Sequence, residues 1–490
     1  MTQARRFDAN LVVIGAGTGG LVSAYVAATL KAKVVLVESQ RMGGDCLNTG
    51  CVPSKTLLRS ARLMKEIERA ASFGIDCGAG SADFAAVMAR VRRAIAAIEP
   101  HDSAARFRGL GVEVVQGRAR LTSPWTVAVT ADSGAARTIT TRSIVIATGA
   151  APTVPKIPGL DDVGYLTSET IWDLAALPKR LLVLGGGPIG CELAQAFARL
   201  GARVTVVDAA PCLLTREDPE VAAAVAAGLR ADGVVLLTGR QAMRCERDGE
   251  AGRLVLAATG SEGETAIEFD RLLCAVGRTP RVEDYGLEEL GIGINAKTKT
   301  IETDAYLRTS RPNIYAVGDV AGPYQFTHTA AEQAATATMN ALLGGLKRSR
   351  FDAAVIPWAT FTDPEVARVG LSETEAREAN IAFEVTRYAL DELDRAITDG
   401  ATGGFVKVLT VPGQDRILGA TIVGERAGDL LAEFVLAMKH GLGLKKIFAT
   451  IHIYPTFAEA NRNAATQWQQ AHLSPGLLRW ARRYHAWRRA

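Results

Sequence analysis

The distribution of apolar and polar positions along the chain repeats one plan in two places. Residues 10–38 and 180–208 each read as an apolar run, a glycine-rich turn, a helix-like stretch, a second apolar run and an acidic residue. Short apolar runs bounded by turns predict buried strands, so each segment predicts a strand–helix–strand unit. Because Gly15 and Gly185 lie 170 positions apart, the repeat is too long for a solenoid and predicts two separate nucleotide-binding folds.

The rest of the pattern predicts how these two folds are connected. Residues 110–150 alternate between apolar and polar positions, as short strands do, and lead into a proline-rich linker. We predict an α/β protein with two Rossmann-like dinucleotide-binding domains and a C-terminal α+β domain. The expected boundaries are 1–151 and 281–350 for the first domain, 152–280 for the second, 351–468 for the third and 469–490 for a terminal helix.

Composition and charge narrow the class of protein. The chain has 490 residues, and its net charge of +4 comes from residues 461–490, which hold six arginines and no acidic residue. The remainder sums to −2 (4 − 6), which argues against a nucleic-acid-binding surface. The uncharged stretch 11–30 resembles a signal peptide or a membrane span, but its glycines and the strand that follows favour a strand–turn–helix. We therefore expect a cytoplasmic protein.

Each glycine-rich turn has the spacing that lets a backbone approach a pyrophosphate. Such turns place the phosphates at a helix N-terminus, and the acid at the end of the next strand accepts hydrogen bonds from the ribose. The residues expected to do this are Gly15, Gly17, Gly20 and Glu38 in the first fold, and Gly185, Gly187, Gly190 and Asp208 in the second.

The second fold is expected to bind NAD(H) rather than NADP(H). An acid such as Asp208 would repel a 2′-phosphate, and residues 209–214 contain no arginine that could bind one. Arg216 lies just beyond this stretch and keeps NADP(H) as the alternative.

Two of the seven cysteines, Cys46 and Cys51, stand five positions apart behind two glycines. They lack the second Cys/His pair of a zinc site, and a structural disulfide does not fit a cytosolic protein. We interpret them as a redox pair. Five positions along a regular helix separate the Cα atoms too far for a disulfide, so a distortion at 48–50 is expected. Pro53 predicts the first turn of a helix whose dipole would favour a thiolate at Cys51.

Several motifs together resemble the FAD-dependent pyridine nucleotide–disulfide oxidoreductases, over about residues 5–470. They are GGDCLNTGCVPSK (43–55), the two dinucleotide folds in this order, and the short motifs ATG, GRTP and YAVGD. This family includes dihydrolipoamide dehydrogenase, glutathione reductase and mercuric reductase. The resemblance implies that FAD binds the first fold, that nicotinamide binds the second, and that electrons pass through the flavin to the Cys46–Cys51 disulfide. Cys51 would face the flavin, and Cys46 would exchange with the substrate.

The resemblance also implies roles for single residues. Glu38 would bind the FAD ribose, Asp319 would bind the ribityl or pyrophosphate part, and Lys55 would lie near the flavin and pair with Glu192. Further cofactor contacts are expected from Gly44, Gly117, Thr148, Gly149, Gly277, Gln325 and His328. No metal ligands are expected. The third domain would build a homodimer and lend a catalytic segment to the partner's active site.

That catalytic segment departs from the family pattern. Thiol-reducing members carry His-Pro-Thr-x-x-Glu, in which the Glu orients a His base, whereas here Tyr454 stands in the His position and Glu459 ends the motif. A phenol with a pKa of about 10 is a poor base. We therefore expect His452 to carry the acid/base work and Tyr454 to position the substrate. Side chains two positions apart on an extended backbone share a face, so both are expected to face the partner's Cys46.

The electron acceptor stays open at this point. A small or lipoyl-type disulfide is the main expectation. Mercuric reductase has a Tyr in the same position, but its C-terminal cysteine pair is absent here, since no Cys follows Cys274. A quinone is a further alternative. Outside enzymes, the alternative is a membrane-docked redox sensor or electron-input adaptor.

Residues 474–490 lie outside the resemblance. Ser474 and Pro475 predict a helix cap and a first turn. Apolar residues then recur at helical spacing among five arginines, at Leu477, Trp480, Tyr484 and Trp487. Packing on the protein itself and docking to a membrane surface or a protein partner both agree with this pattern.

Overall fold

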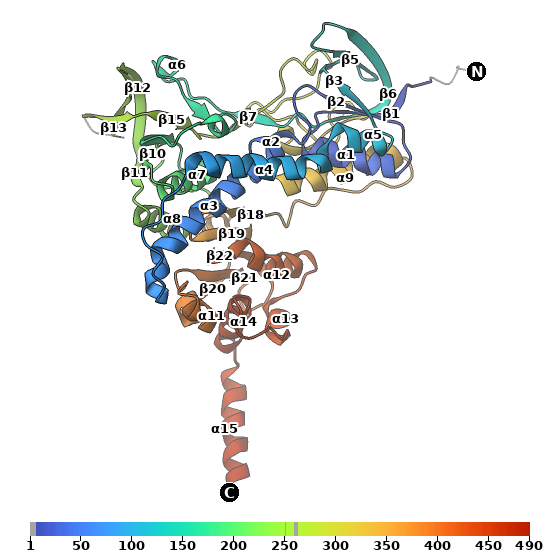
Figure 1. The fold of residues 1–490 in the computed structure, drawn as a ribbon. Coiled ribbons are helices and arrows are strands. Elements are labelled where there is room, and N and C mark those ends of the chain that lie inside the picture. Colours follow the sequence, from blue (N-terminus) through green and yellow to red (C-terminus); the bar gives the residue numbers. More distant parts are fainter. Residues whose placement is uncertain (1–5, 250, 259–262) are drawn as a thin grey trace. The chain divides into compact units, whose positions relative to one another are not determined.

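The computed structural model describes residues 6–249, 251–258 and 263–490. These residues form two compact bodies. Body 1 comprises the chain up to residue 209 together with 240–352, and body 2 comprises 210–239 and 353–490. Among the described residues, no helix is both long and apolar enough to cross a membrane. The predicted fold class is confirmed: two Rossmann-like folds lie in body 1, and an α+β fold makes up body 2 (Figure 1).

The first dinucleotide-binding fold supplies the larger sheet of body 1. Its elements are β1 (Ala9–Ile14), α1 (Thr18–Thr29), β2 (Val34–Glu38), α2 (Gly44–Asn48), α3 (Cys51–Arg69), η1 (Ala70–Phe73), α4 (Phe84–Asp102), α5 (Ala104–Gly109), β3 (Glu113–Gln116), β4 (Arg118–Ser123), β5 (Thr126–Thr130), β6 (Ala136–Ile146), β7 (Ala150–Pro152), β17 (Ile314–Ala316), η3 (Gly318–Val320) and α9 (Thr327–Leu343). Strands β3, β2, β1, β6 and β17 pair in parallel, and β5 and β4 continue from β6 as an antiparallel ribbon.

The apolar run of β1 is explained by burial on both faces of this sheet. Val12 and Ile14 belong to one buried cluster, whereas Leu11 and Val13 belong to another. Alternate residues of a strand point to opposite faces, so a parallel strand covered on both sides reads as continuously apolar rather than alternating.

The second dinucleotide-binding fold completes body 1. Its elements are α6 (Leu160–Val163), β8 (Leu166–Thr167), η2 (Ile171–Asp173), β9 (Arg180–Leu184), α7 (Pro188–Arg199), β10 (Arg203–Asp208), β12 (Arg240–Asp248), β13 (Ala251–Ala258), β14 (Glu264–Phe269), β15 (Arg271–Cys274) and β16 (Arg278–Pro280). Strands β10, β9, β15 and β8 pair in parallel, and β12, β13 and β14 form an antiparallel sheet. The antiparallel pair of β16 with β7 joins the two folds.

Body 2 is an antiparallel sheet covered by helices. Its elements are α8 (Pro219–Ala231), β11 (Val235–Thr238), β18 (Pro357–Thr360), β19 (Glu365–Gly370), α10 (Glu373–Glu378), β20 (Glu384–Ala389), η4 (Leu390–Glu392), α11 (Asp394–Thr398), β21 (Phe405–Thr410), β22 (Ile417–Gly424), α12 (Ala427–Lys439), α13 (Leu444–Ala449), α14 (Glu459–Ala471) and α15 (Pro475–Arg489). The strand order is β18-β19-β22-β21-β20. Phe434 of α12 and Trp468 of α14 are buried in one cluster with the apolar residues of these strands.

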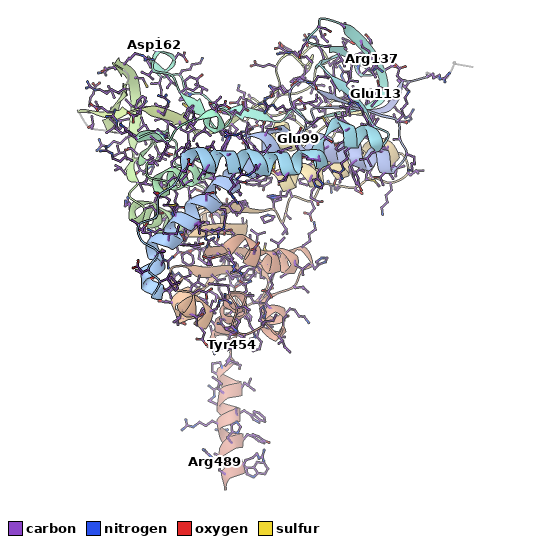
Figure 2. All side chains as sticks on the ribbon, in the orientation of Figure 1. Glu99, Glu113, Arg137, Asp162, Tyr454 and Arg489 are labelled. Carbon is purple, nitrogen blue, oxygen red and sulfur yellow. The ribbon has the colours of Figure 1, made fainter. Side chains whose placement is uncertain are left out.

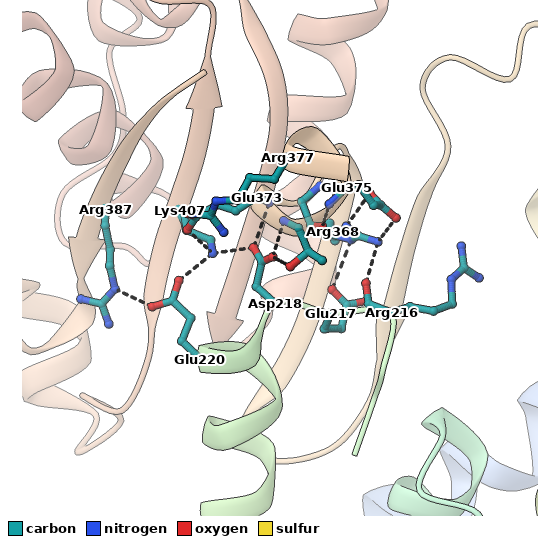
Figure 3. A network of polar contacts seen from close by, with 12 residues as sticks. Arg216, Glu217, Asp218, Glu220, Arg368, Glu373, Glu375, Arg377, Arg387 and Lys407 are labelled. Atoms are coloured by element: carbon teal, nitrogen blue, oxygen red, sulfur yellow. Dashed lines mark hydrogen bonds and ion pairs between the residues drawn. The ribbon is translucent and has the colours of Figure 1, made fainter. Parts of the chain in front are cut away.

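A buried charged network holds residues 216–220 against this sheet (Figure 3). Lys407 of β21 is 1% exposed, and its Nζ lies 2.6 Å from Asp218 Oδ2, 2.6 Å from Glu220 Oε1 and 3.0 Å from Glu373 Oε1. A lysine is almost never buried unless it is paired. These carboxylates are therefore a condition for placing Lys407 inside body 2.

The network continues with a second buried cation, Arg368. Arg368 of β19 is fully buried and donates to both carboxylate oxygens of Glu375 at 2.8 and 3.0 Å, and its Nε lies 3.2 Å from Glu217 Oε2. The guanidinium groups of Arg368 and Arg216 lie 4.3 and 5.2 Å from the centroid of the Trp358 ring. Arg216, the residue that kept NADP(H) open, thus packs its charge against an aromatic ring of body 2.

Candidate active site

The first glycine-rich turn follows β1 and opens α1. Gly15 has a φ of +96°, and a Cβ at Gly20 would lie 1.7 Å from the carbonyl oxygen of Gly15, so a larger residue at either position would force the turn apart. Gly17 is the N-cap of α1 and offers no side chain to the first N–H groups. Free N–H groups at a helix start suit a phosphate, so this turn fits the pyrophosphate of FAD.

Glu38 is fixed at the end of β2 beside this turn. One carboxylate oxygen accepts a hydrogen bond from the N–H of Ala16 at 2.5 Å, and the other accepts from the N–H of Gln40 at 2.7 Å. Gly117 donates its N–H to the Glu38 carbonyl at 2.8 Å and has a φ of +154°. The predicted ribose-binding acid is thus held in one orientation by backbone groups.

The chain crosses over the first turn before it reaches the cysteines. The N–H of Gly43 donates to the carbonyl of Ala16 at 2.9 Å. Gly44 has a φ of +57°, and a Cβ there would lie 2.5 Å from Cα of Gly17. The first turn is therefore covered by the segment that carries the redox pair.

The second glycine-rich turn repeats the geometry of the first. Gly185 has a φ of +107°, and a Cβ at Gly190 would lie 1.9 Å from the Gly185 carbonyl oxygen. Asp208 accepts a hydrogen bond from the N–H of Gly186 at 2.5 Å. A Cβ at Gly187, the N-cap of α7, would meet no atom of the described chain within 4 Å.

Cys46 and Cys51 lie on two helices with a break between them, as predicted. Helix α2 ends at Asn48, and α3 begins at Cys51. The side-chain amide of Asn48 donates to the carbonyls of Met42 and Gly44 at 3.0 and 2.8 Å. The break replaces regular helical spacing, and it leaves Cys51 in the first turn of a 19-residue helix.

The two thiols have opposite shifts in pKa. A hydrogen bond from Cys46 is the largest of the influences that lower the pKa of Cys51 to about 6; burial opposes it, and Thr327 and Lys55 assist it. The same hydrogen bond, together with burial, raises the pKa of Cys46. Sγ of Cys51 lies 3.4 Å from Oγ1 of Thr327. In the dithiol form Cys51 is therefore the thiolate, and Cys46 keeps its proton.

Lys55 and Glu192 are brought together across two helices of body 1. Nζ of Lys55 on α3 lies 2.8 Å from Oε2 of Glu192 on α7, with side-chain exposures of 37% and 7%. The pair places a positive charge one turn after Cys51. The contact agrees with the expected pairing, and the role of Lys55 beside a flavin stays a prediction.

An ionic cluster next to Cys46 was missed from the sequence. Arg278 donates to the carboxylate of Asp45 and to the Ala150 carbonyl, and its Nε lies 3.6 Å from Oδ2 of Asp319. Burial raises the pKa of Asp319, and the charge of Arg278 opposes this shift. The sequence feature that could have indicated this cluster is the arginine of the GRTP motif, Arg278. A charged side chain in a short, partly buried strand requires a carboxylate partner.

The remaining predicted cofactor residues lie in the same part of body 1. Thr148 donates its hydroxyl to the carbonyl of Arg281 at 2.7 Å, and the Arg281 N–H donates to the carbonyl of Gly149 at 2.9 Å. Gly277 has a φ of +133°. Gln325 is half-buried, and His328 is exposed and stacks on Phe326 with ring centroids 5.4 Å apart. Their contacts to cofactors stay predictions.

A second missed residue supports the break between the cysteines. The indole N–H of Trp172 lies 2.8 Å from the carbonyl of Thr49 and 2.8 Å from that of Ser168. Because Thr49 is the C-cap of α2, this contact satisfies a carbonyl that the helix cannot. A tryptophan 123 positions away gave no sequence signal for this role.

The catalytic segment of body 2 differs from the expected geometry. The prediction that His452 and Tyr454 share a face is wrong: the His452 side chain is 7% exposed, whereas Tyr454 is 67% exposed. The rule of alternation fails because residues 451–458 belong to no strand: 451–453 have no regular structure, 454–456 form a bend and 457–458 form a turn.

Both ring nitrogens of His452 are engaged within body 2. Nδ1 lies 3.0 Å from the Thr450 carbonyl, and Nε2 lies 3.0 and 3.2 Å from the two carboxylate oxygens of Glu433. Glu433 also accepts a hydrogen bond from the side-chain amide of Asn461 at 3.0 Å. This geometry favours a structural role for His452 over the predicted acid/base role.

Tyr454 and Glu459 form separate contacts. The hydroxyl of Tyr454 donates to Oδ2 of Asp394 at 2.9 Å, which raises the pKa of Tyr454. Glu459 is the first residue of α14 and accepts a hydrogen bond from the Thr456 N–H at 3.1 Å, so its carboxylate holds the turn that precedes the helix. Among the described residues, no group of three or more His, Cys, Asp or Glu side chains could hold a metal ion.

Comparisons with known proteins identify the family. The family described as pyridine nucleotide-disulphide oxidoreductase matches residues 9–334, and the dimerisation domain of that family matches residues 356–465. The chain is 36% identical to a mercuric reductase of Streptomyces lividans over 460 residues, which cover 93% of this chain and 95% of that one. It is 34% identical to a dihydrolipoyl dehydrogenase of Chlamydia muridarum over 450 residues, which cover 91% and 94% of the two chains.

A solved structure gives the same result. The Cu(II) complex of the HOCl-induced flavoprotein disulfide reductase RclA from Escherichia coli superposes with a TM-score of 0.83 at 28% identity, and covers 94% of this chain and 99% of that one. The chain therefore belongs to the pyridine nucleotide–disulphide oxidoreductases, as a homodimeric FAD enzyme with NAD(P)H as its electron donor.

Proposed function

We propose that this enzyme transfers electrons from NADH to a small disulfide of the lipoyl type through Cys46 and Cys51. The observation that carries the proposal is the pair of neighbouring thiols with opposite pKa shifts, Cys46 in α2 and Cys51 at the start of α3, beside the covered turn. FAD, when bound, supplies the two-electron relay between nicotinamide and the protein disulfide. The resting thiolate belongs to Cys51, and the exchanging sulfur belongs to Cys46.

The two cysteines supply both electrons and one of the two protons that reduce the substrate disulfide, and solvent supplies the other proton. Proton transfer along the hydrogen bond from Cys46 to Cys51 makes Cys46 the nucleophile, which attacks one sulfur of the substrate and releases the first thiolate. Cys51 then attacks Sγ of Cys46, its proton passes to the second thiolate, and solvent protonates the first. The substrate disulfide gains two electrons and two protons, and the protein dithiol becomes a disulfide.

This internal proton transfer offsets the absence of the family's imidazole. The ring of His452 is held by Thr450 and Glu433, and Tyr454 is kept protonated by Asp394. We propose that Tyr454 of one subunit reaches the dithiol of the other, where its single O–H leaves Asp394 and donates a hydrogen bond to the departing thiolate. Its 67% exposure in the single chain leaves it accessible for such a contact.

A thiophilic metal ion is the second candidate acceptor. The supporting observation is that Tyr454, a poor base, stands where thiol-reducing members of the family have a histidine. A soft cation needs no such base, because it binds two thiolates directly and displaces the remaining proton. Mercuric reductases among the relatives agree with this candidate. The absence of any Cys after Cys274 opposes it, since no second pair could deliver the ion.

Steady-state assays of the FAD-loaded enzyme separate these candidates. NADH oxidation should be measured with lipoamide, glutathione disulfide, Hg(II) and a quinone, in the wild type and in Cys46→Ser. Turnover of a disulfide that requires Cys46 supports the first proposal. Turnover of Hg(II) without turnover of any disulfide would replace it with the second, and quinone turnover that survives Cys46→Ser would contradict both.

The role of His452 has its own test within the same assay. A catalytic base normally contributes at least about 10²-fold. We expect His452→Asn to change disulfide turnover by less than about threefold per folded enzyme, because both of its nitrogens are already bound. A hundredfold loss with intact flavin reduction would restore the acid/base assignment.

The finer choice of coenzyme is NADH. Asp208 presents a carboxylate where a 2′-phosphate would lie, and the guanidinium of Arg216 packs on Trp358 within body 2. A negative charge at this strand end disfavours NADP(H).

We further propose that residues 474–490 are a docking element outside the catalytic fold. The family matches end at residue 465. The apolar side chains of this helix are exposed in the single chain, which supports a contact made with something other than its own body.

A further inference from the structure

Helix α15 is a complete helix that no other element of body 2 covers. It extends from α14 through residues 472–474, with Ser474 at its N-cap (Figure 1). All of its residues are exposed except Ala481, which is half-buried. The sequence also agreed with packing of this helix on its own protein, but in the structure α15 does not pack on body 2.

One side of α15 carries an aromatic and aliphatic stripe. The rings of Trp480 and Tyr484 stack with centroids 5.4 Å apart at 9°, and Tyr484 contacts Trp487 at 6.1 Å. Leu477 continues the stripe one turn earlier, since positions three, seven and ten residues apart share a helix face. Leu477, Trp480 and Trp487 are 52%, 61% and 73% exposed.

The other side of α15 is strongly basic. At 100° per residue, Arg479, Arg482 and Arg489 lie away from the aromatic stripe, Arg483 lies at its edge beside Trp487, and Arg488 lies on the side of the stripe at the C-terminal end. None of these five arginines forms an ion pair with any described residue of the chain. Residues 461–490 contain no acidic residue at all (Figure 2, where Arg489 marks the end of the helix).

We propose that α15 lies in the interfacial plane of a bilayer that contains anionic phospholipids. This inference rests on the docking role proposed above for residues 474–490. The indole and phenol rings would enter the boundary between headgroups and acyl chains, and the arginines would pair with lipid phosphates. At about 1.5 Å per residue the helix is about 22 Å long, too short and too charged to span the roughly 30 Å apolar core.

Charge selects the membrane over a second copy of this chain. Two α15 helices in contact would gather ten arginines without a single carboxylate, counting five from each copy. Like charges at close range oppose such pairing. A lipid surface instead offers phosphates to the arginines and an apolar layer to the rings at the same time, which matches both faces of the helix.

The test uses the full-length, FAD-loaded enzyme and sedimentation with vesicles. Flavin absorbance in the pellet measures binding to phosphatidylcholine vesicles with and without phosphatidylglycerol. We expect binding to the anionic vesicles that weakens with added salt. Arg482→Gln with Arg483→Gln should weaken it by about 30-fold, since each basic residue near an anionic surface contributes about 1 kcal/mol. Trp480→Ser with Trp487→Ser should also weaken it.

Arg92→Gln with Arg93→Gln is the matched control. These exposed neighbours on α4 remove the same charge from another helix, and the variant should bind as the wild type does. Equal loss in both arginine variants, equal binding to neutral vesicles, or no binding to any vesicle overturns the proposal. The last result, joined to tail-dependent binding of a purified acidic polypeptide, would assign α15 to a protein partner.

Turnover of NADH and a disulfide without vesicles keeps this test separate from the proposed catalytic function. The tail variants should leave it unchanged. A tail that binds membranes on an enzyme without disulfide turnover would contradict the catalytic proposal alone.

Discussion

The two glycine-rich turns of body 1 are almost the same at the backbone and differ in what lies over them. Gly17 and Gly187 cap their helices with φ of −75° in both cases, and each turn has an acid that accepts the N–H after the first glycine. However, Gly44 lies against Gly17, whereas no atom of the described chain would meet a Cβ at Gly187.

We infer that this difference separates a cofactor that stays bound from a coenzyme that exchanges. A covered turn retains its ligand because release requires movement of the segment above it, and that segment leads directly to Cys46. An open turn lets a coenzyme arrive and leave in each cycle. We infer that the same phosphate-binding geometry serves two duties, and that the covering segment, not the glycine pattern, decides between them.

The largest effect on turnover should come from replacing the two cysteines at the end of the covering segment. Cys51→Ser and Cys46→Ser should each lower NADH-dependent disulfide turnover by at least about 10³-fold, the scale of a lost nucleophile. FAD content should stay at the wild-type level in both, because neither side chain shapes the turn. Turnover measured against flavin-counted enzyme checks this, and substantial activity in either variant would show that the redox centre lies elsewhere.

Uncovering the first turn should have the next largest effect. In Gly44→Ala the new Cβ would press on Cα of Gly17 from a left-handed backbone, so we expect loss of most of the FAD and about 2–4 kcal/mol of stability. Gly187→Ala is the matched change in the open turn and should keep its FAD. The flavin-to-protein absorbance ratio and thermal unfolding measure both. If the two variants behave alike, the distinction between the turns is lost.

A change at Asp208 tests which coenzyme the open turn prefers. We expect the wild type to prefer NADH over NADPH by at least about tenfold in kcat/KM, equivalent to about 1.4 kcal/mol, and Asp208→Ala to narrow that ratio without loss of FAD. Removing the carboxylate relieves repulsion of a 2′-phosphate. A wild type that prefers NADPH would refute the assignment, and Arg216→Ala would then be the variant to examine.

The smallest expected effect is a shift on the pH axis. In NADH-reduced enzyme, alkylation of Cys51 by iodoacetamide should rise as the pH increases through about 6, because the thiolate forms above its pKa. Cys46→Ala removes the hydrogen bond that most lowers this pKa, so the midpoint should move upward. Mass spectrometry of the alkylated peptide gives the midpoint. An unmoved midpoint would show that Lys55 or the helix dipole, rather than Cys46, lowers the pKa of Cys51.

Much of body 1 could be predicted because its determinants are local. Glycine spacing and apolar runs within about thirty positions identified both turns, and β1 and β9 lie where those runs predict strands. The break between the cysteines was predicted from the demands of disulfide geometry and is confirmed. Each of these features depends on neighbours in the sequence.

The features that escaped prediction join distant residues. Asp45 meets Arg278 across 233 positions, and the crossing of Gly44 over Gly17 appears only when the chain is folded. His452 was assigned to a face by assuming an extended strand, but residues 451–453 belong to no regular element and a bend follows at 454–456. Sequence spacing predicts direction only where a regular repeat exists.

The charges around Lys407 set a rule for recombining this enzyme with its relatives. A chimera that exchanges residues 152–280 as a cassette would carry away Asp218 and Glu220 while Lys407 stays behind in the recipient. Unless the donor supplies carboxylates at both positions, Lys407 keeps Glu373 but loses its two shorter ion pairs, and breaking a buried ion pair costs about 3–5 kcal/mol, enough to unfold many grafts. Crossover points at 209 and 239 keep residues 210–239 with the recipient, so that each buried charge retains its counterion.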